Sequence, residues 1–192
     1  TGFPLRAHRR CDEPMFSIAN EIAYSGQMVK AMNSNSTEAF IGLSCWFDVS
    51  TSATLINRHV IKEEIEFLTE KIKELRIMNY SGDIYIISPF KSVALYCENT
   101  FRTDKKIACG TIHRFQGKEA DIVFLVLGSD PKSSGARNWA SQKPNMLNVA
   151  LTRAKKRFYV IGNKRLWANC NYFNTMSKTL NEKKTEGILS HS

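Results

Sequence analysis

The chain has 192 residues, of which 43% are hydrophobic and 23% charged, enough for one domain with a sizeable core. No apolar run approaches the ~20 residues that cross a bilayer, and residues 1–10 contain no apolar signal segment, so we expect a cytoplasmic protein with no membrane partner. The formal net charge is +9, and residues 89–170 alone carry 15 basic and 5 acidic side chains, which favours a polyanionic partner.

Three elements are predicted in the first 82 residues. Residues 14–26 place apolar side chains on one helical face, with a proline in the first turn and a glycine at the end, and this pattern predicts a short amphipathic helix. Residues 40–49 are typical of a strand. A long helix is predicted next, capped by Asn57 and ended by Ser81-Gly82. Its apolar side chains recur at helical spacing: Ile61, Ile65, Leu68, Ile72 and Leu75.

Strands and helices alternate from residue 83 onwards. Four short apolar runs predict strands, at 83–88, 106–112, 121–128 and 157–162. Helical patterns occupy 90–102 and 145–155. Several of the runs are apolar on both faces, which parallel strands covered by helices on each side require. The pattern predicts an α/β fold with a doubly wound, mainly parallel sheet and helices on both faces, in which ligands bind at the carboxyl ends of the strands.

Two polar segments interrupt or follow this pattern. Residues 129–144 are predicted to form a 16-residue loop, which is either a nucleic-acid-contacting loop or a mobile excursion. Residues 171–192 are predicted to form a C-terminal helix and polar tail, after a domain that spans residues 1–170.

Motifs for phosphate or metal binding are incomplete. The sequence GTIHRFQGKE resembles a phosphate-binding loop, but six residues rather than four separate Gly110 from Gly117, and Glu119 stands where Ser or Thr would bind magnesium. The five cysteines are widely spaced without a C-x-x-C pair, which argues against a disulfide framework or a structural zinc and favours inert thiols. We therefore predict neither a complete nucleotide hydrolase nor a resident metal site.

Arg153 is a charged residue on a predicted buried helix. The helix at 145–155 is apolar almost all round, so we expect it to lie in the interior. Arg153 shares a face with apolar side chains, where a guanidinium is costly unless an anion meets it. The anion is either an internal carboxylate or a phosphate in a cleft, and the spacing alone does not choose between them.

Three ordered segments carry a family resemblance. LRAHRRC at 5–11, TIHRFQGKEADIVFLVLG at 111–128 and NVALTRAKKRFYVIGN at 148–163 resemble motifs IV, V and VI of superfamily I helicases. The group most resembled is the nonsense-decay and replication-helicase type, with a RecD-like motif V. ISPFKSVA at 87–94 looks like the T-P-Y-x-x-Q element of that group. The resemblance covers nearly the whole chain.

The resemblance implies a second, C-terminal RecA-like domain of a two-domain motor, a P-loop NTPase-type fold that lacks its own P-loop. ATP with Mg²⁺ would be held mainly by an N-terminal RecA-like domain of the same parent protein. By motif match, Arg10 and Arg153 are the arginines that reach the γ-phosphate across the cleft. Gln116, Gly117 and Glu119 match nucleotide contacts, with Glu119 accepting from the ribose and Gly117 letting the backbone approach the phosphates.

Seven residues are predicted to contact nucleic acid: Ser88, Pro89, Phe90, Lys91, Thr111, His113 and Arg114. Phe90 supplies either a base-stacking surface or ordinary packing at a helix start. Lys132, Arg137 and Lys143 are further cations available to a nucleic-acid backbone.

The sequence thus predicts the C-terminal motor domain of an ATP-dependent helicase that contacts single-stranded DNA or RNA, with 5′-to-3′ polarity implied only by the group resembled. ATP would draw Arg10 and Arg153 onto its γ-phosphate. The isolated chain is expected to have negligible ATPase activity. Two alternatives stay open: a non-catalytic nucleic-acid-binding module that kept the fold, and the motor part of a helicase-nuclease.

Overall fold

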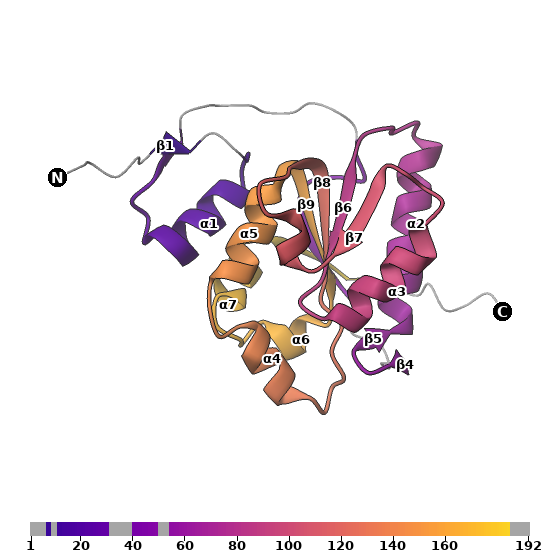
Figure 1. Ribbon diagram of the computed structural model, residues 1–192. Coiled ribbons are helices and arrows are strands. Elements are labelled where there is room, and N and C mark those ends of the chain that lie inside the picture. The colour runs from indigo at the N-terminus through magenta and orange to yellow at the C-terminus, as the bar shows by residue number, and fades with distance from the viewer. Residues whose placement is uncertain (1–6, 9–10, 31–39, 50–53, 185–192) are drawn as a thin grey trace.

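The computed structural model describes residues 7–8, 11–30, 40–49 and 54–184. Its centre is a six-stranded sheet in which every neighbouring pair of strands is parallel (Figure 1). In spatial order the strands are β10 (Asn181–Lys184), β3 (Cys45–Asp48), β9 (Ala154–Gly162), β8 (Ala120–Val126), β6 (Ile84–Ile87) and β7 (Ile107–Gly110). The predicted α/β class and parallel sheet are confirmed.

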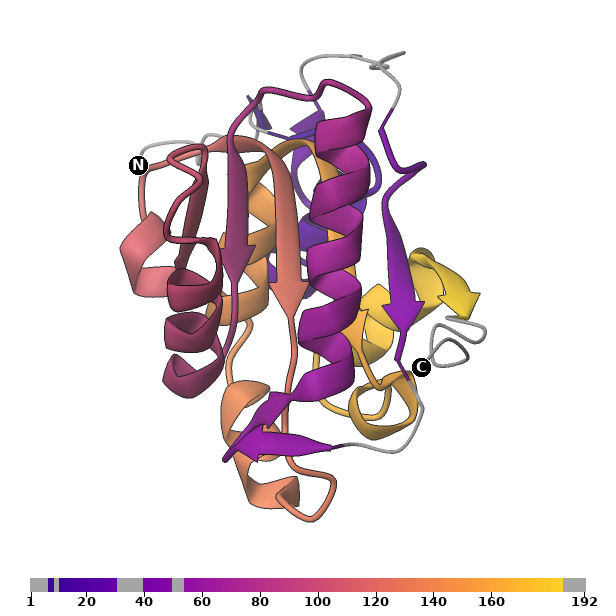
Figure 2. The same ribbon diagram turned by 90° about the vertical axis from the view of Figure 1, so that its right-hand side faces the viewer.

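Helices cover both faces of this sheet (Figure 2). α2 (Lys62–Ile77) and α3 (Lys91–Phe101) lie on one face, and α1 (Met15–Tyr24) and α5 (Asn145–Arg153) lie on the other. The elements before β3 and after β9 are β1 (Ala7–His8), β2 (Val29–Lys30), α6 (Lys164–Trp167) and α7 (Phe173–Thr179). Across the described ranges, each helix is too short or too polar to pass through a bilayer.

The core lies on both sides of the central strands. In β8, residues 122–126 are all fully buried, as their continuous apolar run predicts for a strand covered on each face. Phe124 of β8 is in register with Tyr159 of β9, and their rings lie 5.2 Å apart. Trp46 of β3 is also fully buried, and its indole N–H donates to the Gly162 carbonyl at 3.0 Å. Each such side chain contributes about 2 to 3 kcal/mol by its burial.

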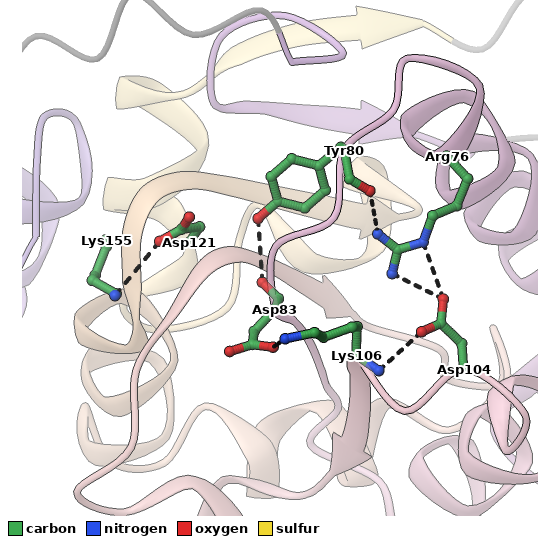
Figure 3. A network of polar contacts seen from close by, with 7 residues as sticks. All are labelled: Arg76, Tyr80, Asp83, Asp104, Lys106, Asp121 and Lys155. Atoms are coloured by element: carbon green, nitrogen blue, oxygen red, sulfur yellow. Dashed lines mark hydrogen bonds and ion pairs between the residues drawn. The ribbon is translucent and has the colours of Figure 1, made fainter.

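Partly exposed polar contacts organise the amino ends of β6 and β7 (Figure 3). Arg76 of α2 donates to the Asp104 carboxylate at 2.9 and 3.0 Å, and to the Tyr80 carbonyl at 2.6 Å. Lys106 pairs with Asp83 at 3.3 Å. Exposed ion pairs of this kind contribute up to about 1 kcal/mol. Their main effect is to fix the turns at this end of the sheet.

The predicted cap of the long helix is wrong. Asn57 lies in β4 (Leu55–Asn57), which pairs antiparallel with β5 (Val60–Ile61), and α2 begins only after this hairpin. The first N–H of the helix, that of Lys62, instead donates to the Thr54 carbonyl at 2.9 Å, and the Thr54 N–H donates to the Glu63 carboxylate at 3.0 and 3.2 Å. A carboxylate at this end also complements the helix dipole.

The segment 129–144, predicted as a loop, contains the helix α4 (Ser134–Ala140). Arg137 of this helix is 7% exposed. Its guanidinium donates to the Ser129 hydroxyl and to the Asp130 carbonyl, both at 2.9 Å. Arg137 is therefore a structural residue, and its interpretation as a cation available to nucleic acid is wrong. These contacts within the segment fold it into a compact unit.

Residues after 170 add a strand as well as a helix. α7 buries Phe173 and Met176, and the Phe173 ring lies 4.8 Å from that of Trp167. β10 then pairs in parallel with β3 and becomes an edge of the sheet. The predicted polar tail is thus helical only in part, because it also supplies sheet hydrogen bonds.

β8 is followed by a buried turn at Gly128. Its φ is +59°, and its N–H donates to a carboxylate oxygen of Glu64 at 2.7 Å. A Cβ on Gly128 would lie 2.4 Å from the carbonyl oxygen of His59. The same oxygen accepts from the Ser129 N–H at 3.0 Å, so it cannot easily move away. Both the dihedral angle and the available space therefore require glycine here.

We expect Gly128→Ala to lower the free energy of unfolding by more than about 2 kcal/mol, because left-handed strain adds to a backbone clash. Gly117→Ala is the matched control, since φ is +76° there but a Cβ would meet nothing within 4 Å. This variant should lose only about 1 to 2 kcal/mol, from strain alone. Urea unfolding followed by tryptophan fluorescence compares the two, and equal losses would contradict the steric argument.

Candidate nucleic-acid groove and arginine site

A groove of about 740 Å³ opens at the carboxyl ends of β6 and β7. Its walls come from the turns after these two strands, from the residues just before β5, and from α4 and the start of α5. Six of the seven residues predicted to contact nucleic acid line it: Ser88, Pro89, Phe90, Lys91, Thr111 and His113. The groove therefore lies at the edge of the sheet where the sequence predicts ligand binding.

The turn between β6 and α3 holds four of these residues in a fixed conformation. Ser88 is fully buried, and its N–H donates to the Gly110 carbonyl at 3.1 Å. The Ser88 hydroxyl oxygen accepts from the Phe90 N–H at 3.2 Å. Lys91 is exposed at the first position of α3. The turn thus presents a cation at the groove while its backbone is anchored to β7.

Phe90 is a packing residue. It is only 6% exposed, and its ring stacks on that of His59 with the centroids 4.1 Å apart. Of the two interpretations of Phe90, packing at a helix start therefore holds, because little of its ring is available to a base. Burial and the neighbouring Arg58 lower the pKa of His59. The imidazole is thus neutral at pH 7 and adds no charge to the groove.

The fully charged side chains that line the groove are all cationic: Arg58, Lys91 and Lys143. Among the lining residues in the described ranges there is no Asp or Glu. Arg58 lies in the turn between β4 and β5, with φ +42°. Sequence reasoning missed Arg58, because no motif links position 58 to positions 88–91. A groove with this charge is suited to a polyanion.

Arg114, the seventh predicted contact, does not line the groove. Its guanidinium forms an ion pair with Glu98 of α3 and donates to the Cys109 carbonyl at 2.6 Å. These contacts attach the 3₁₀ helix η1 (Ile112–Phe115) to α3 and to the end of β7. Lys132 also lies outside the lining of the groove.

Arg153 is the last residue of α5 and is 5% exposed. Its guanidinium donates to the carbonyls of Lys118 at 3.0 Å and Phe115 at 3.4 Å. It also donates to the Val149 carbonyl at 3.2 Å and to the Thr152 hydroxyl at 3.1 Å. These four oxygens hold the guanidinium at the end of α5 against the connection that leads into β8.

One connection joins the groove to Arg153. Residues 111–119 leave β7 at the groove, form η1 and reach Arg153 just before β8 begins. Phe115 anchors the middle, since it is 1% exposed and its ring lies 4.6 Å from that of Tyr85 in β6. The predicted nucleotide contacts are exposed on the second half of this connection: Gln116, Gly117 and Glu119. The structure thus brings them close to Arg153.

The surroundings of Tyr85 support this placement. Burial and Asp83 raise the pKa of Tyr85. Arg153 lowers the same pKa and Glu119 raises it, so the charges of Arg153 and Glu119 both act on the Tyr85 hydroxyl. At Gly117 a Cβ would meet nothing within 4 Å, and glycine is required there by its φ of +76°. Arg10, the other predicted phosphate-contacting arginine, lies outside the described residues.

The thiols show no sign of reactivity. Burial raises the pKa of Cys45 to about 11 and that of Cys109 to about 12, so both stay protonated at neutral pH. In the part of the chain that the structure describes, no group of three or more His, Cys, Asp or Glu side chains is arranged to hold a metal ion.

Glu64 is a buried acid in the first turn of α2. It is 2% exposed and accepts the hydrogen bond from Gly128. Burial raises its pKa to about 8; the Gly128 hydrogen bond opposes this shift and Glu63 adds to it. The folded carboxyl group therefore holds a proton near pH 7 that the unfolded chain releases above its ordinary pKa of 4.5.

Stability is therefore expected to fall as the pH rises from about 5 to about 8, by at most about 1.4 kcal/mol per pH unit from this group. The sign follows because the folded state binds the proton more tightly than the unfolded state. Glu64→Gln removes the titration and should flatten the dependence, whereas Glu63→Gln should keep it. Urea unfolding across this pH range measures the slopes. Parallel slopes for Glu64→Gln and the unmodified chain would show that Glu64 does not titrate in this way.

A mainly parallel six-stranded sheet with helices on both faces is the α/β architecture of a RecA-like domain. The family model described as "AAA domain" matches residues 3–165. The chain belongs to this family and is a C-terminal-type domain of the superfamily I helicases.

Helicases are among the curated proteins to which the chain is similar. A probable helicase of Dictyostelium discoideum is 26% identical over 153 residues, which are 76% of this chain and 16% of that protein. The DNA polymerase alpha-associated DNA helicase A of Saccharomyces cerevisiae is 26% identical over 127 residues, 64% of this chain and 18% of that protein. Regulator of nonsense transcripts 1 of Dictyostelium discoideum is 28% identical over 138 residues, 65% of this chain and 10% of that protein.

The chain spans less than a fifth of the length of these relatives. A solved structure of the PRRSV nsp10 helicase aligns with 81% of this chain and 23% of its own, with a TM-score of 0.35 and 14% identity.

Proposed function

We propose that this chain is the second motor domain of an ATP-dependent helicase that moves along single-stranded DNA or RNA. ATP with Mg²⁺ is held mainly by an N-terminal RecA-like domain, and this chain completes the nucleotide site from across the cleft. The observation that carries the proposal is the connection 111–119. Its first residues line the cationic groove, and carbonyls near its end are held by Arg153.

On the nucleotide side, Arg153 and Arg10 contact the γ-phosphate when the two domains close. Arg153 suits this role because its guanidinium holds carbonyls of the connection 111–119, and a phosphate oxygen makes a stronger, charge-assisted hydrogen bond than a carbonyl does. Glu119 is exposed near Arg153 and accepts from the ribose hydroxyls, with Gln116 and Gly117 along the same edge. The bound nucleotide supplies the phosphoryl group that these residues stabilise.

On the nucleic-acid side, the groove holds the sugar-phosphate backbone. Lys91, Lys143 and Arg58 neutralise phosphates, and Thr111, the residue just after β7, lines the same groove. Contacts of this kind follow the backbone and do not read base sequence, which suits a motor that steps along any strand.

The coupling step is an exchange of hydrogen-bond acceptors. When Arg153 turns to a phosphate oxygen, it releases a carbonyl of Phe115 or Lys118. The connection 111–119 is then free to shift, and its first residues, Thr111 and His113, move in the groove. Nucleotide binding thus changes the contacts of the groove with the strand through the connection 111–119. The change is a population shift between the arrangement with Arg153 on the carbonyls and the arrangement with Arg153 on the phosphate.

We expect the isolated chain to show negligible ATPase activity. In the parent protein, joined to its N-terminal domain, Arg153→Ala should lower the strand-stimulated ATPase rate by about a thousandfold or more, because transition-state charge loses its partner. ATP binding should change little, since the other domain holds most of the nucleotide. Phosphate release at saturating oligo(dT) gives the rate, and a fluorescent ATP analogue gives the binding.

Arg165→Ala is the control, since Arg165 is exposed on α6 and distant in sequence from the connection. It should keep the unmodified rate. Robust turnover by the isolated chain would overturn the two-domain proposal. An unchanged rate in Arg153→Ala would favour a nucleic-acid-binding module that has kept the fold without the motor.

The groove is tested by charge reversal. Lys91→Glu and Lys143→Glu should each weaken oligo(dT) and oligo(U) binding, and each should reduce the slope of log K against log salt by about 0.7, the value for one lost phosphate contact on a single strand. Lys73→Glu is the matched control, because Lys73 is exposed on α2 and does not line the groove. Fluorescence anisotropy measures the affinities. Equal losses in all three variants would mean that binding is diffuse and that the groove is not the track.

A further inference from the structure

Trp139 is an exposed aromatic side chain on the wall of the groove. It is 66% exposed, whereas the other two tryptophans of the chain, Trp46 and Trp167, are fully buried. The same side chain also borders a second hollow, of about 480 Å³. An indole kept in water forgoes the stabilisation that burial gives. The proposed function does not yet assign it a role.

The helix that carries Trp139 is held in place by buried hydrogen bonds. Arg137, two residues earlier, binds the Ser129 hydroxyl and the Asp130 carbonyl, and the Ser141 hydroxyl donates to the Arg137 carbonyl at 2.9 Å. α4 is therefore fixed to the segment that follows β8. A ring on such a support loses little conformational entropy when a ligand binds, which favours a stacking contact.

The surroundings of Trp139 fit a nucleic acid better than an apolar protein surface. On the groove side lie the cations Lys143, Lys91 and Arg58. The second hollow is also lined by residues whose side chains end in amides: Asn138, Gln142, Asn169 and Asn171. Cations pair with phosphates and amides bond to base edges, while the indole matches the face of a base. The groove side also carries apolar residues such as Ile112, Ala140 and Met146, so the preference for a nucleic acid rests on the cations and amide-bearing residues that accompany the indole.

We propose that Trp139 is the base-stacking residue of this domain and that it takes an unpaired base of the strand held in the groove. This inference rests on the proposed nucleic-acid binding and adds a contact to it. Phe90 does not fill the role, because its ring is already stacked on His59. The strand then lies with its phosphates on the cations of the groove and one base against the indole.

The test uses the whole 192-residue chain and two oligonucleotides, oligo(dT) and a strand of equal length in which every position is abasic. The unmodified chain should bind oligo(dT) about tenfold more tightly than the abasic strand. Trp139→Ala should bind both strands equally, with the affinity that the unmodified chain has for the abasic strand. Trp139→Phe should restore most of the preference. Circular dichroism and urea unfolding confirm that each variant is folded.

Intrinsic fluorescence gives a second, independent measurement. Because Trp46 and Trp167 are fully buried, quenching by oligo(dT) should come from Trp139 and should vanish in Trp139→Ala. The abasic strand should quench little. If Trp139→Ala keeps the full preference for oligo(dT), or if no quenching accompanies binding, the stacking inference is wrong while the groove stands. If the unmodified chain binds neither strand, both the groove and the stacking contact are wrong.

Discussion

The hydrogen bonds from the Arg153 guanidinium to the carbonyls of Lys118 and Phe115 are the constraint on which the functional surface depends. They bring the end of α5 together with a connection that crosses from one end of the sheet to the other. A phosphate oxygen is a stronger acceptor for a guanidinium than a backbone carbonyl is, so it can displace these carbonyls from Arg153. The same bonds that stabilise the resting structure therefore define what a bound phosphate would change.

Two other buried polar contacts keep the groove in shape. Glu64 of α2 holds the turn at Gly128, just after β8. Arg137 then holds α4, which lines the groove, to the residues that follow this turn. Rigid walls reduce the entropy that is lost when a strand binds.

The sequence predicts the central strands well, because a strand such as 121–128 is apolar on both faces and only a covered sheet accommodates that pattern. It predicts poorly wherever stability comes from distant contacts. α4 is not predicted, because its sequence does not repeat an apolar stripe. The helix is held instead by hydrogen bonds from Arg137 to the turn before it. β10 is not predicted either, because its sequence NEKK is polar, and among the described strands it pairs with β3 alone, as an edge strand does.

The residues of the candidate site likewise fall into those that the sequence predicts and those that only the structure reveals. The resemblance selects residues that the structure gathers around one groove, such as Lys91 and Thr111. It does not select Arg58 or Trp139, which reach the groove from a hairpin turn and from α4 and belong to no quoted motif. The burial of Arg153 follows from helical periodicity, whereas its backbone acceptors are set by tertiary packing alone.

Hydrogen exchange of the chain with and without oligo(dT), followed by mass spectrometry, tests most directly whether the two sites are coupled. Strand binding should protect the groove segments at 88–91 and 111–113. It should also change the exchange of 115–119, although Gln116 to Glu119 do not line the groove. Arg153→Lys, which keeps the charge but has fewer donors, should lose this second change. Protection confined to the groove in the unmodified chain would contradict coupling through the connection 111–119.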